Sequence, residues 1–260
     1  MKRAALFLFF LLVAVYSYGQ DMKFIDHDLT DLYKRISYLY ERSRDPKDPL
    51  YINADTLIAA NKIFSERLLH YTSTMPVTLA YDFPELQKAG VEIASSPDHQ
   101  LRIYSWDTWL GGTMGYYGDL FQYKGDKVYA VIPPRSEHEI GSMYSAVWTI
   151  DVPQQKVYVA RSGASFSNWD KYESISFFRI ENNALNDSIK LIKVNDQLKN
   201  KYGVEFNSFS LKENESPLSL IAIDSRNATI KFRDVNSKLG VTDQYTTYRF
   251  NGHCFEKQGQ

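Results

Sequence analysis

Aromatic and acidic side chains gather in two stretches of this sequence. The first stretch, residues 101–123, holds Trp106, Asp107, Trp109, Tyr116 and Tyr117, and the second holds Asn168, Trp169 and Asp170. Aromatic faces can stack on the apolar face of a sugar ring, while carboxylates and amides bond to its hydroxyls. We therefore take these residues as candidates for a ligand site. The competing interpretation is structural, because large aromatic residues often pack in a core or anchor a loop.

Paired carboxylates would allow a different chemistry. Hydrolysis of a glycoside needs two carboxyl groups at a defined separation, and Asp107, Asp170 and Glu139 are the candidates here. The sequence does not give the distances between them. We keep a glycan or peptidoglycan hydrolase as the alternative function and assign no catalytic residue.

Four glycines in the first stretch suggest a phosphate-binding loop, but the context is wrong. Gly111, Gly112, Gly115 and Gly118 lack the Lys-Ser/Thr pair of a P-loop, and the next segment has the pattern of a strand and not of a helix. The pattern favours a wide connection between two paired strands, where glycine adopts unusual backbone angles at no steric cost. We predict no nucleotide and no other cofactor.

Three histidines lie beside acidic residues, in residues 26–28, 98–99 and 137–139. Neighbouring side chains on a strand or loop point in different directions and rarely chelate one ion together. We expect solvated charge clusters here and no metal site. Cys254, the single cysteine, lies in an expected terminal hairpin strand, where a small buried residue has a structural role, and His253 beside it is not evidence for a nucleophile and base pair.

The first residues have the three zones of a secretory signal peptide. Lys2 and Arg3 precede an apolar run over residues 4–15, and small and polar residues follow up to Gly19. The run is shorter than the roughly 20 residues of a membrane-spanning helix. We predict cleavage near Gly19, and a mature chain that is exported to the periplasm or beyond, is soluble and has no transmembrane segment.

Composition narrows the class of partner. Removal of residues 1–19 would leave 28 of the 30 basic residues against 31 acidic ones. Nucleic-acid binding normally needs a basic excess or a basic stripe, so we predict no nucleic-acid partner. A single cysteine allows no internal disulfide, and stability must then come from the hydrophobic core.

Helical periodicity is confined to the first third of the chain. Apolar residues recur at helical spacing over residues 28–40 and 57–71, the second segment capped by Asn53 or Asp55. A short helix is expected at residues 83–89, between Pro84 and Gly90. We expect the first two helices to pack in antiparallel fashion and to form a helical subregion over residues 20–75.

Downstream the pattern changes to strands separated by turn residues. The expected pairs are residues 91–94 with 101–106, 120–124 with 128–132, 146–151 with 157–161, 174–180 with 189–194, 218–223 with 228–233, and 245–250 with 254–257. Residues 128–132 are apolar on both faces, which is typical of a central strand. Residues 181–187 and 195–202 have the composition of polar connectors, and the second can hold a short helix with Leu198 facing inward.

The predicted fold class is α+β and mainly β, with the helical pair packed on an antiparallel meander over residues 76–260. We favour a sandwich or open barrel, and an incomplete propeller-like arrangement is the alternative. No linker composition divides the mature chain, so we expect one compact unit.

Four short segments of the chain resemble segments of other proteins. They are residues 102–108 (RIYSWDT), 111–113, 120–123 and 248–252. In these segments and in its order of regions, the chain resembles uncharacterised exported β-rich proteins of Bacteroidota-type bacteria. The resemblance implies an envelope or secreted setting and supplies no catalytic residue. We therefore expect a non-enzymatic binding module for a glycan or an envelope protein; a hydrolase and a purely structural envelope protein are the alternatives.

Overall fold

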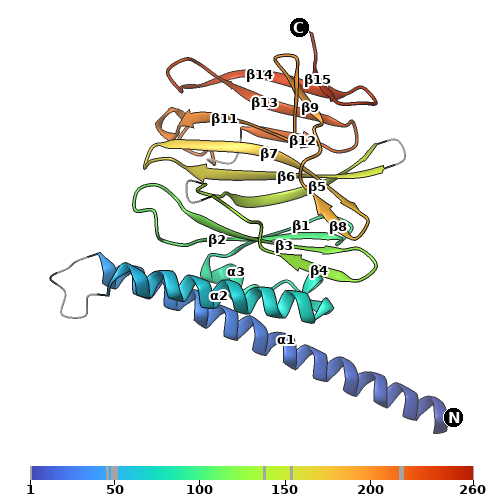
Figure 1. Ribbon diagram of the computed structural model, residues 1–260. Coiled ribbons are helices and arrows are strands. Elements are labelled where there is room, and N and C mark those ends of the chain that lie inside the picture. Colours follow the sequence, from blue (N-terminus) through green and yellow to red (C-terminus); the bar gives the residue numbers. More distant parts are fainter. Residues whose placement is uncertain are drawn as a thin grey trace. The chain divides into compact units, whose positions relative to one another are not determined.

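The computed structural model describes residues 2–44, 47, 52–136, 139–152, 155–216 and 220–259, with side chains described from residue 21 onward except at residue 155. It contains two compact units, Met1–Val91 and Glu92–Gln260 (Figure 1). The first unit is helical, and the second consists of strands with one short 3-10 helix, η2.

The helical unit contains α1 (Lys2–Ser43), α2 (Ala54–Thr74), the 3-10 helix η1 (Pro76–Leu79) and α3 (Pro84–Ala89). The predicted spacing in α1 is confirmed, because Leu29, Tyr33 and Ile36 are buried. The helix begins far earlier than residue 28, since helical backbone continues back to Lys2. The side chain of Asn53 caps α2 by accepting a hydrogen bond from the Thr56 N–H at 3.2 Å.

Helices α1 and α2 pack in antiparallel fashion, as expected. Tyr33 of α1 meets Phe64 of α2 with ring centroids 5.5 Å apart, and earlier in α1 Asp28 pairs with Arg67, which lies later in α2. Residues of increasing number on one helix therefore meet residues of decreasing number on the other. The contact buries the apolar face of each helix.

Helix α3 receives its cap from another helix. Asp26 of α1 is buried, and its two carboxylate oxygens accept hydrogen bonds from the N–H groups of Glu85 and Leu86 at 3.1 and 3.0 Å. The negative charge also lies where the helix dipole is positive. Gly90 ends the helix with φ of 110°, a left-handed conformation that glycine adopts without strain.

The second unit contains three sheets in which nearly all neighbouring strands are antiparallel. The four-stranded sheet has the order β1-β2-β3-β4, the five-stranded sheet has the path β11-β7-β6-β5 with β8 beside β7, and the six-stranded sheet has the order β10-β9-β15-β14-β13-β12. One pair, β15 with β9, is parallel. The strands are β1 (Glu92–Ser95), β2 (Leu101–Asp107), β3 (Tyr117–Lys124), β4 (Val128–Val131), β5 (Met143–Val152), β6 (Gln155–Ser165), β7 (Asp170–Glu181), β8 (Ala184–Asn186), β9 (Ile192–Val194), β10 (Gln197–Lys199), β11 (Lys201–Asn207), β12 (Ile221–Asp224), β13 (Thr229–Val235), β14 (Val241–Phe250) and β15 (Phe255–Lys257).

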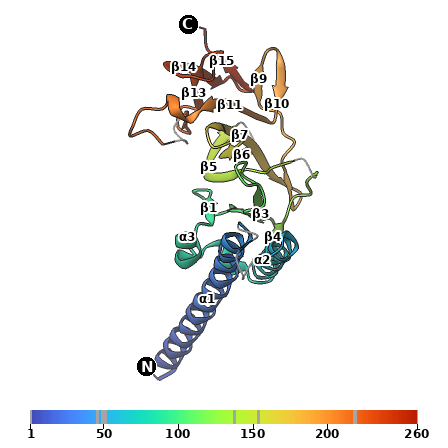
Figure 2. The same cartoon turned by 90° about the vertical axis from the view of Figure 1, so that its left-hand side faces the viewer.

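The five-stranded sheet is the middle layer of this unit (Figure 2). Strand β6 shows the arrangement, because side chains alternate between the two faces of a strand. Val157 and Val159 join one buried cluster with the six-stranded sheet, while Tyr158 and Ala160 join another with the four-stranded sheet. The middle sheet is therefore apolar on both faces, which explains the lack of a clean hydrophobic alternation in its strands.

The structure confirms an α+β fold dominated by antiparallel strands, with an N-terminal pair of helices. The described strands form open sheets stacked in three layers, one more than a two-sheet sandwich has. Each sheet is built largely from consecutive strands, as in the blades of the propeller-like alternative.

Three expectations about individual strands were wrong. Strand β7 forms its hairpin with β8, which lies inside the expected connector at residues 181–187, and β9 pairs instead with β10 and β15. Residues 197–199 form strand β10, not a helix, and Leu198 is 47% exposed. Strand β4, expected to be central, is an edge strand with Val131 exposed.

Candidate functional site

Trp106, the first of the predicted ligand-binding residues, is a packing residue. Its side chain is only 3% exposed, and it lies opposite Gly118 in the pairing of β2 with β3. A Cβ atom at Gly118 would collide with the Trp106 ring. The glycine thus makes room for the indole, and the ring has no open face for a ligand.

Asp107 and Trp109 organise the connection between β2 and β3. The Asp107 carboxylate accepts a hydrogen bond from the Trp109 N–H at 2.7 Å, and Thr108 donates its N–H to the Tyr116 carbonyl at 2.8 Å. Burial raises the pKa of Asp107, and the hydrogen bond from Trp109 opposes that rise. Trp109 is half-buried with φ of 59°. The aspartate therefore closes the base of the loop.

Tyr116 and Tyr117 lie where this loop meets the middle sheet. The Gly115 N–H donates to the Ser165 carbonyl at the end of β6, and the Tyr117 N–H donates to the Ile140 carbonyl, at 2.9 and 2.8 Å. Burial raises the pKa of Tyr117. The wide connection between two paired strands is confirmed, and the loop is anchored at its end.

The second predicted group lies in the turn between β6 and β7. Trp169 is 49% exposed and stacks on Phe209, itself 71% exposed, with ring centroids 4.0 Å apart. Asn168 is exposed as well. Asp170 accepts hydrogen bonds from the Ser167 hydroxyl at 3.0 Å and the Asn207 amide at 3.2 Å. Trp169 and Phe209 form an open aromatic pair, whereas Trp106 lies in the core.

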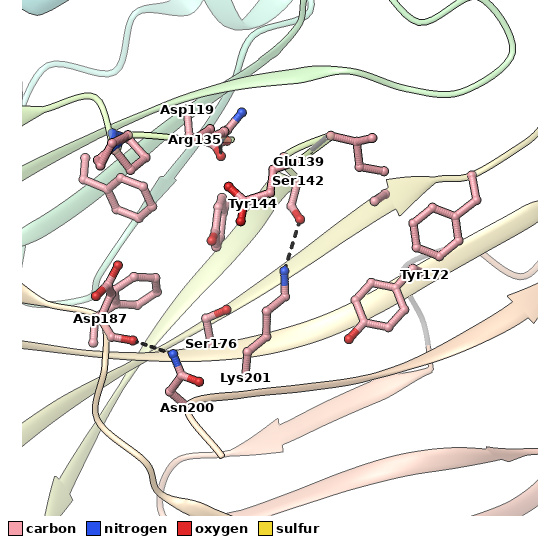
Figure 3. A pocket seen from close by; sticks show the side chains of 18 residues that line it. Asp119, Arg135, Glu139, Ser142, Tyr144, Tyr172, Ser176, Asp187, Asn200 and Lys201 are labelled. Carbon is pink, nitrogen blue, oxygen red and sulfur yellow. Dashed lines mark hydrogen bonds and ion pairs between the residues drawn. The ribbon is translucent and has the colours of Figure 1, made fainter. Parts of the chain in front are cut away.

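A cleft of about 530 Å³ opens between the four-stranded and five-stranded sheets (Figure 3). One side is formed by β3 and by the chain that leads into β5, and the other by the face of the middle sheet. Its lining residues are Asp119, Phe121, Pro133, Pro134, Arg135, Glu139, Ile140, Gly141, Ser142, Tyr144, Ala164, Phe166, Tyr172, Ser176, Phe178, Asp187, Asn200 and Lys201. The volume is within the range typical of small-molecule sites.

Small side chains on the middle sheet make room for this cleft. The strand register places Ser162 beside Ser174, and their hydroxyls are hydrogen-bonded at 3.1 Å. On the same face, Ala164 lies opposite Tyr172 and Ala160 opposite Ser176. Of these residues, Ala164, Tyr172 and Ser176 line the cleft, and larger side chains at Ala164 and Ser176 would fill part of it. The cleft therefore follows from the choice of Ala and Ser on one face of β6 and β7.

Aromatic rings form the base and one wall of the cleft. At the base, Phe121, Tyr144 and Phe178 contact one another with centroid distances of 5.3 to 6.3 Å. At the wall, Phe166 and Tyr172 stack at 5.8 Å, and both are half-buried. The base rings belong to the hydrophobic core, while the wall rings keep surface available to a ligand.

Neutral polar groups reach the cleft from three strands or strand ends. Ser142 is only 4% exposed, Ser176 is also buried, and Ser176 hydrogen-bonds to the buried Tyr144 hydroxyl. Asn200 donates its side-chain amide to the Asp187 carbonyl at 2.9 Å (Figure 3). Hydroxyls that both donate and accept suit a polar ligand with several hydrogen-bonding groups.

Two cationic side chains face the cleft. Arg135 donates to the Tyr117 carbonyl and to the buried carboxylate of Asp119, so its charge is paired. The Lys201 ammonium lies 3.5 Å from the Ser142 hydroxyl and 5.8 Å from the centre of the Tyr172 ring. Burial lowers the pKa of Arg135 and of Lys201, and the pKa of Lys201 is lowered further by the charge of Arg135.

Sequence reasoning missed most of this cleft. Of the residues considered for ligand binding or hydrolysis, Glu139 alone lines it, and Tyr117 contributes a backbone carbonyl near its edge. A usable signal was present in β7, where Ser174 and Ser176 alternate within a strand that is otherwise rich in large apolar residues. Two serines on one face of a buried strand indicate a small or polar space against that face.

The charge clusters expected around the histidines are only partly visible. His27 is exposed and lies 3.4 Å from Asp31 and 3.1 Å from Glu85, and the hydrogen bond to Glu85 raises its pKa. Residues 137 and 138 lie outside the described residues. Within the described residues, no group of three or more His, Cys, Asp or Glu side chains is arranged to hold a metal ion, and no helix is long and apolar enough to cross a membrane.

Comparison of the chain with family models, with curated proteins and with solved structures finds no match.

Proposed function

We propose that this protein is a non-enzymatic binding module of the cell envelope or its surroundings, and that its strand-rich unit binds a glycan in the cleft. The observation that carries the proposal is the combination of half-buried rings, Phe166 and Tyr172, with hydroxyl, amide and charged groups around one open space. Sugar rings present both an apolar face and many hydroxyls, so they match both kinds of lining group.

Export of the protein is part of the proposal. The signal-peptide pattern of residues 1–19 supports export. The first buried side chain described in α1 is Met22, beyond the expected cleavage near Gly19. Cleavage there would leave the described packing of α1 against α2 and α3 intact. Amino-terminal sequencing of protein recovered from the native host should read from Gln20, and an intact Met1 would contradict export by this route.

The binding site is tested with a glycan array followed by calorimetry on the best ligand. Tyr172→Ala should lower the affinity about fivefold, because it removes a stacking surface worth roughly 1 kcal/mol. Trp169→Ala is the matched aromatic control, since Trp169 is exposed outside the cleft. Loss of affinity in the Trp169 variant with none in the Tyr172 variant would place the ligand on the Trp169–Phe209 pair and overturn the cleft.

The same experiment separates binding from hydrolysis. Glu139 is the carboxylate of the hydrolase alternative that lines the cleft. Incubation of the bound glycan with the protein should leave the glycan chain length unchanged. Shortened products that disappear in Glu139→Gln would show a hydrolase in place of a binding module.

A further inference from the structure

Among the described residues, Lys201 lines the cleft without a carboxylate partner, whereas Arg135, the other cation of the cleft, is paired with Asp119. The pairing of β11 with β7 places Lys201 opposite Ser176, on the face of the middle sheet that lines the cleft. Its ammonium contacts the Ser142 hydroxyl, which is a neutral group (Figure 3). Among the described residues, no carboxylate oxygen lies within 4.0 Å of it. An ammonium group that has no carboxylate beside it within the described part of the chain is a favourable place for an anion to bind.

Arg135, whose guanidinium is paired with Asp119, is a second cation that lines the same cleft. The charge of Arg135 disfavours the protonated form of Lys201, so the two cations repel each other across the cleft. Glu139 acts in the opposite direction, but more weakly than Arg135. Lys201 is exposed and lines the cleft. An anion entering from solvent can therefore reach the ammonium and relieve the repulsion between the two cations.

The remaining groups suit the hydroxyls of the same ligand. Glu139 and Asp187 line the cleft and can accept hydrogen bonds from hydroxyls, and Tyr172 lies beside Lys201 with its ring available for stacking. A neutral sugar would use the acceptors and the ring but would offer the lysine no anionic group. A free inorganic anion would use the lysine alone. A saccharide that carries a negative group uses all three kinds of contact.

We propose that the ligand of this cleft is an acidic saccharide, whose carboxylate or phosphate group binds Lys201 and Ser142 while its ring lies on Tyr172. This inference rests on the proposed glycan-binding function and narrows it to one class of ligand. A carboxylate and a phosphate would both pair with the lysine ammonium. The experiment therefore includes one saccharide with each group.

Calorimetry on the full chain compares trigalacturonate with its methyl ester, and a glucose phosphate with glucose. Esterification or loss of phosphate removes the negative charge and leaves the sugar ring in place. We expect at least one acidic member to bind about tenfold more tightly than its neutral partner, a difference of about 1.4 kcal/mol. Preference within one pair identifies whether the site reads a carboxylate or a phosphate.

Variants of Lys201 connect this preference to the cleft. Lys201→Met should abolish the preference for the acidic member, and Lys201→Arg should retain most of it because the charge remains. Lys127→Met is the matched control, since Lys127 is an exposed lysine on a tyrosine ring, Tyr129, outside the cleft. Tryptophan fluorescence of each variant verifies that the strand-rich unit is folded.

The outcomes distinguish this inference from the function on which it rests. Equal affinity for acidic and neutral members, or a preference that survives in Lys201→Met, would overturn the acidic ligand and leave glycan binding in place. Absence of binding to all four saccharides and to a glycan array would overturn both. A preference that Lys201→Met removes and Lys127→Met retains supports the inference.

Discussion

Glu173 makes the stability of the strand-rich unit depend on pH. The residue lies in β7 and is fully buried, and its carboxylate accepts hydrogen bonds from the N–H groups of Leu220 and Ile221 at 2.8 and 3.2 Å. The guanidinium of Arg161 lies 3.9 Å away. The carboxylate thus connects the middle sheet to the start of β12 in the six-stranded sheet.

Burial raises the pKa of Glu173 from 4.5 to about 7, although the two N–H donors and Arg161 oppose that rise. Since the pKa is higher in the folded than in the unfolded chain, protonation favours the folded state. The stabilisation is fully present below about pH 4.5 and is lost as the pH rises through about 7. At about 1.4 kcal/mol per unit of pKa, the full effect is about 3 kcal/mol, of which about 2.5 kcal/mol falls between about pH 5 and about pH 8.

Urea unfolding monitored by tryptophan fluorescence measures this effect. All four tryptophans belong to the unit Glu92–Gln260, so the signal reports that unit alone. In the natural protein the free energy of unfolding contains a component that falls by about 2.5 kcal/mol from about pH 5 to about pH 8. Glu173→Gln should lack this component, and Glu205→Gln, at an exposed site on β11, should retain it. The same pH difference in the Glu173 variant and in the natural protein would refute the reasoning.

Further predictions concern packing and capping. Gly118→Ala should lower the free energy of unfolding of the strand-rich unit by about 1–3 kcal/mol, because its Cβ collides with Trp106; an unchanged urea midpoint and fluorescence spectrum would contradict this. Phe177→Ala should cost about 3–5 kcal/mol in the same assay, since the ring is fully buried between two sheets, and a cost below about 1 kcal/mol would show that the site collapses. Asp26→Ala should remove the cap of α3 and cost about 1–2 kcal/mol in thermal unfolding followed by circular dichroism, with Asp26→Asn affected less; equal stability of all three proteins would show that the cap contributes nothing.

Local signals in the sequence predicted most of the elements. Helical spacing identified the buried faces of α1 and α2, and Asn53 and Gly90 occupy the cap positions expected of them. Turn residues identified most of the hairpins, including the pair β14 and β15 around Asn251 and Gly252. These features depend on residues that are close in sequence, so the sequence pattern contains the information directly.

Pairing between strands that are distant in sequence could not be predicted from local patterns. Strand β9 pairs with β15, which is about sixty residues away, and its parallel pairing has no turn signal between the partners. Strand β4 is apolar on both sides yet lies at a sheet edge. There Tyr129 of β4 stacks on Tyr123 of the neighbouring strand β3. Apolar pattern alone does not distinguish burial by a sheet from burial by a neighbouring ring.

The cleft could not be predicted from local sequence patterns either. The tryptophans were conspicuous because of their size, but Trp106 serves the core and Trp169 packs on Phe209. The cleft depends instead on small side chains, because Ala164 and Ser176 line it on the face of the middle sheet. A cavity is created by the absence of side-chain volume on facing strands, and the facing strand is known only once the sheets are stacked.

Strand β7 is covered on both faces and carries polar residues on each. Toward the six-stranded sheet, Glu173 lies in line with Ile175 and Phe177 and holds the backbone of β12. Toward the four-stranded sheet, Tyr172 and Ser176 line the cleft. Buried polar groups are costly unless each has a partner. On the first face the partners are N–H groups of the protein itself. On the second face the hydroxyls and Lys201 border open space, and it is there that a ligand has contacts to gain.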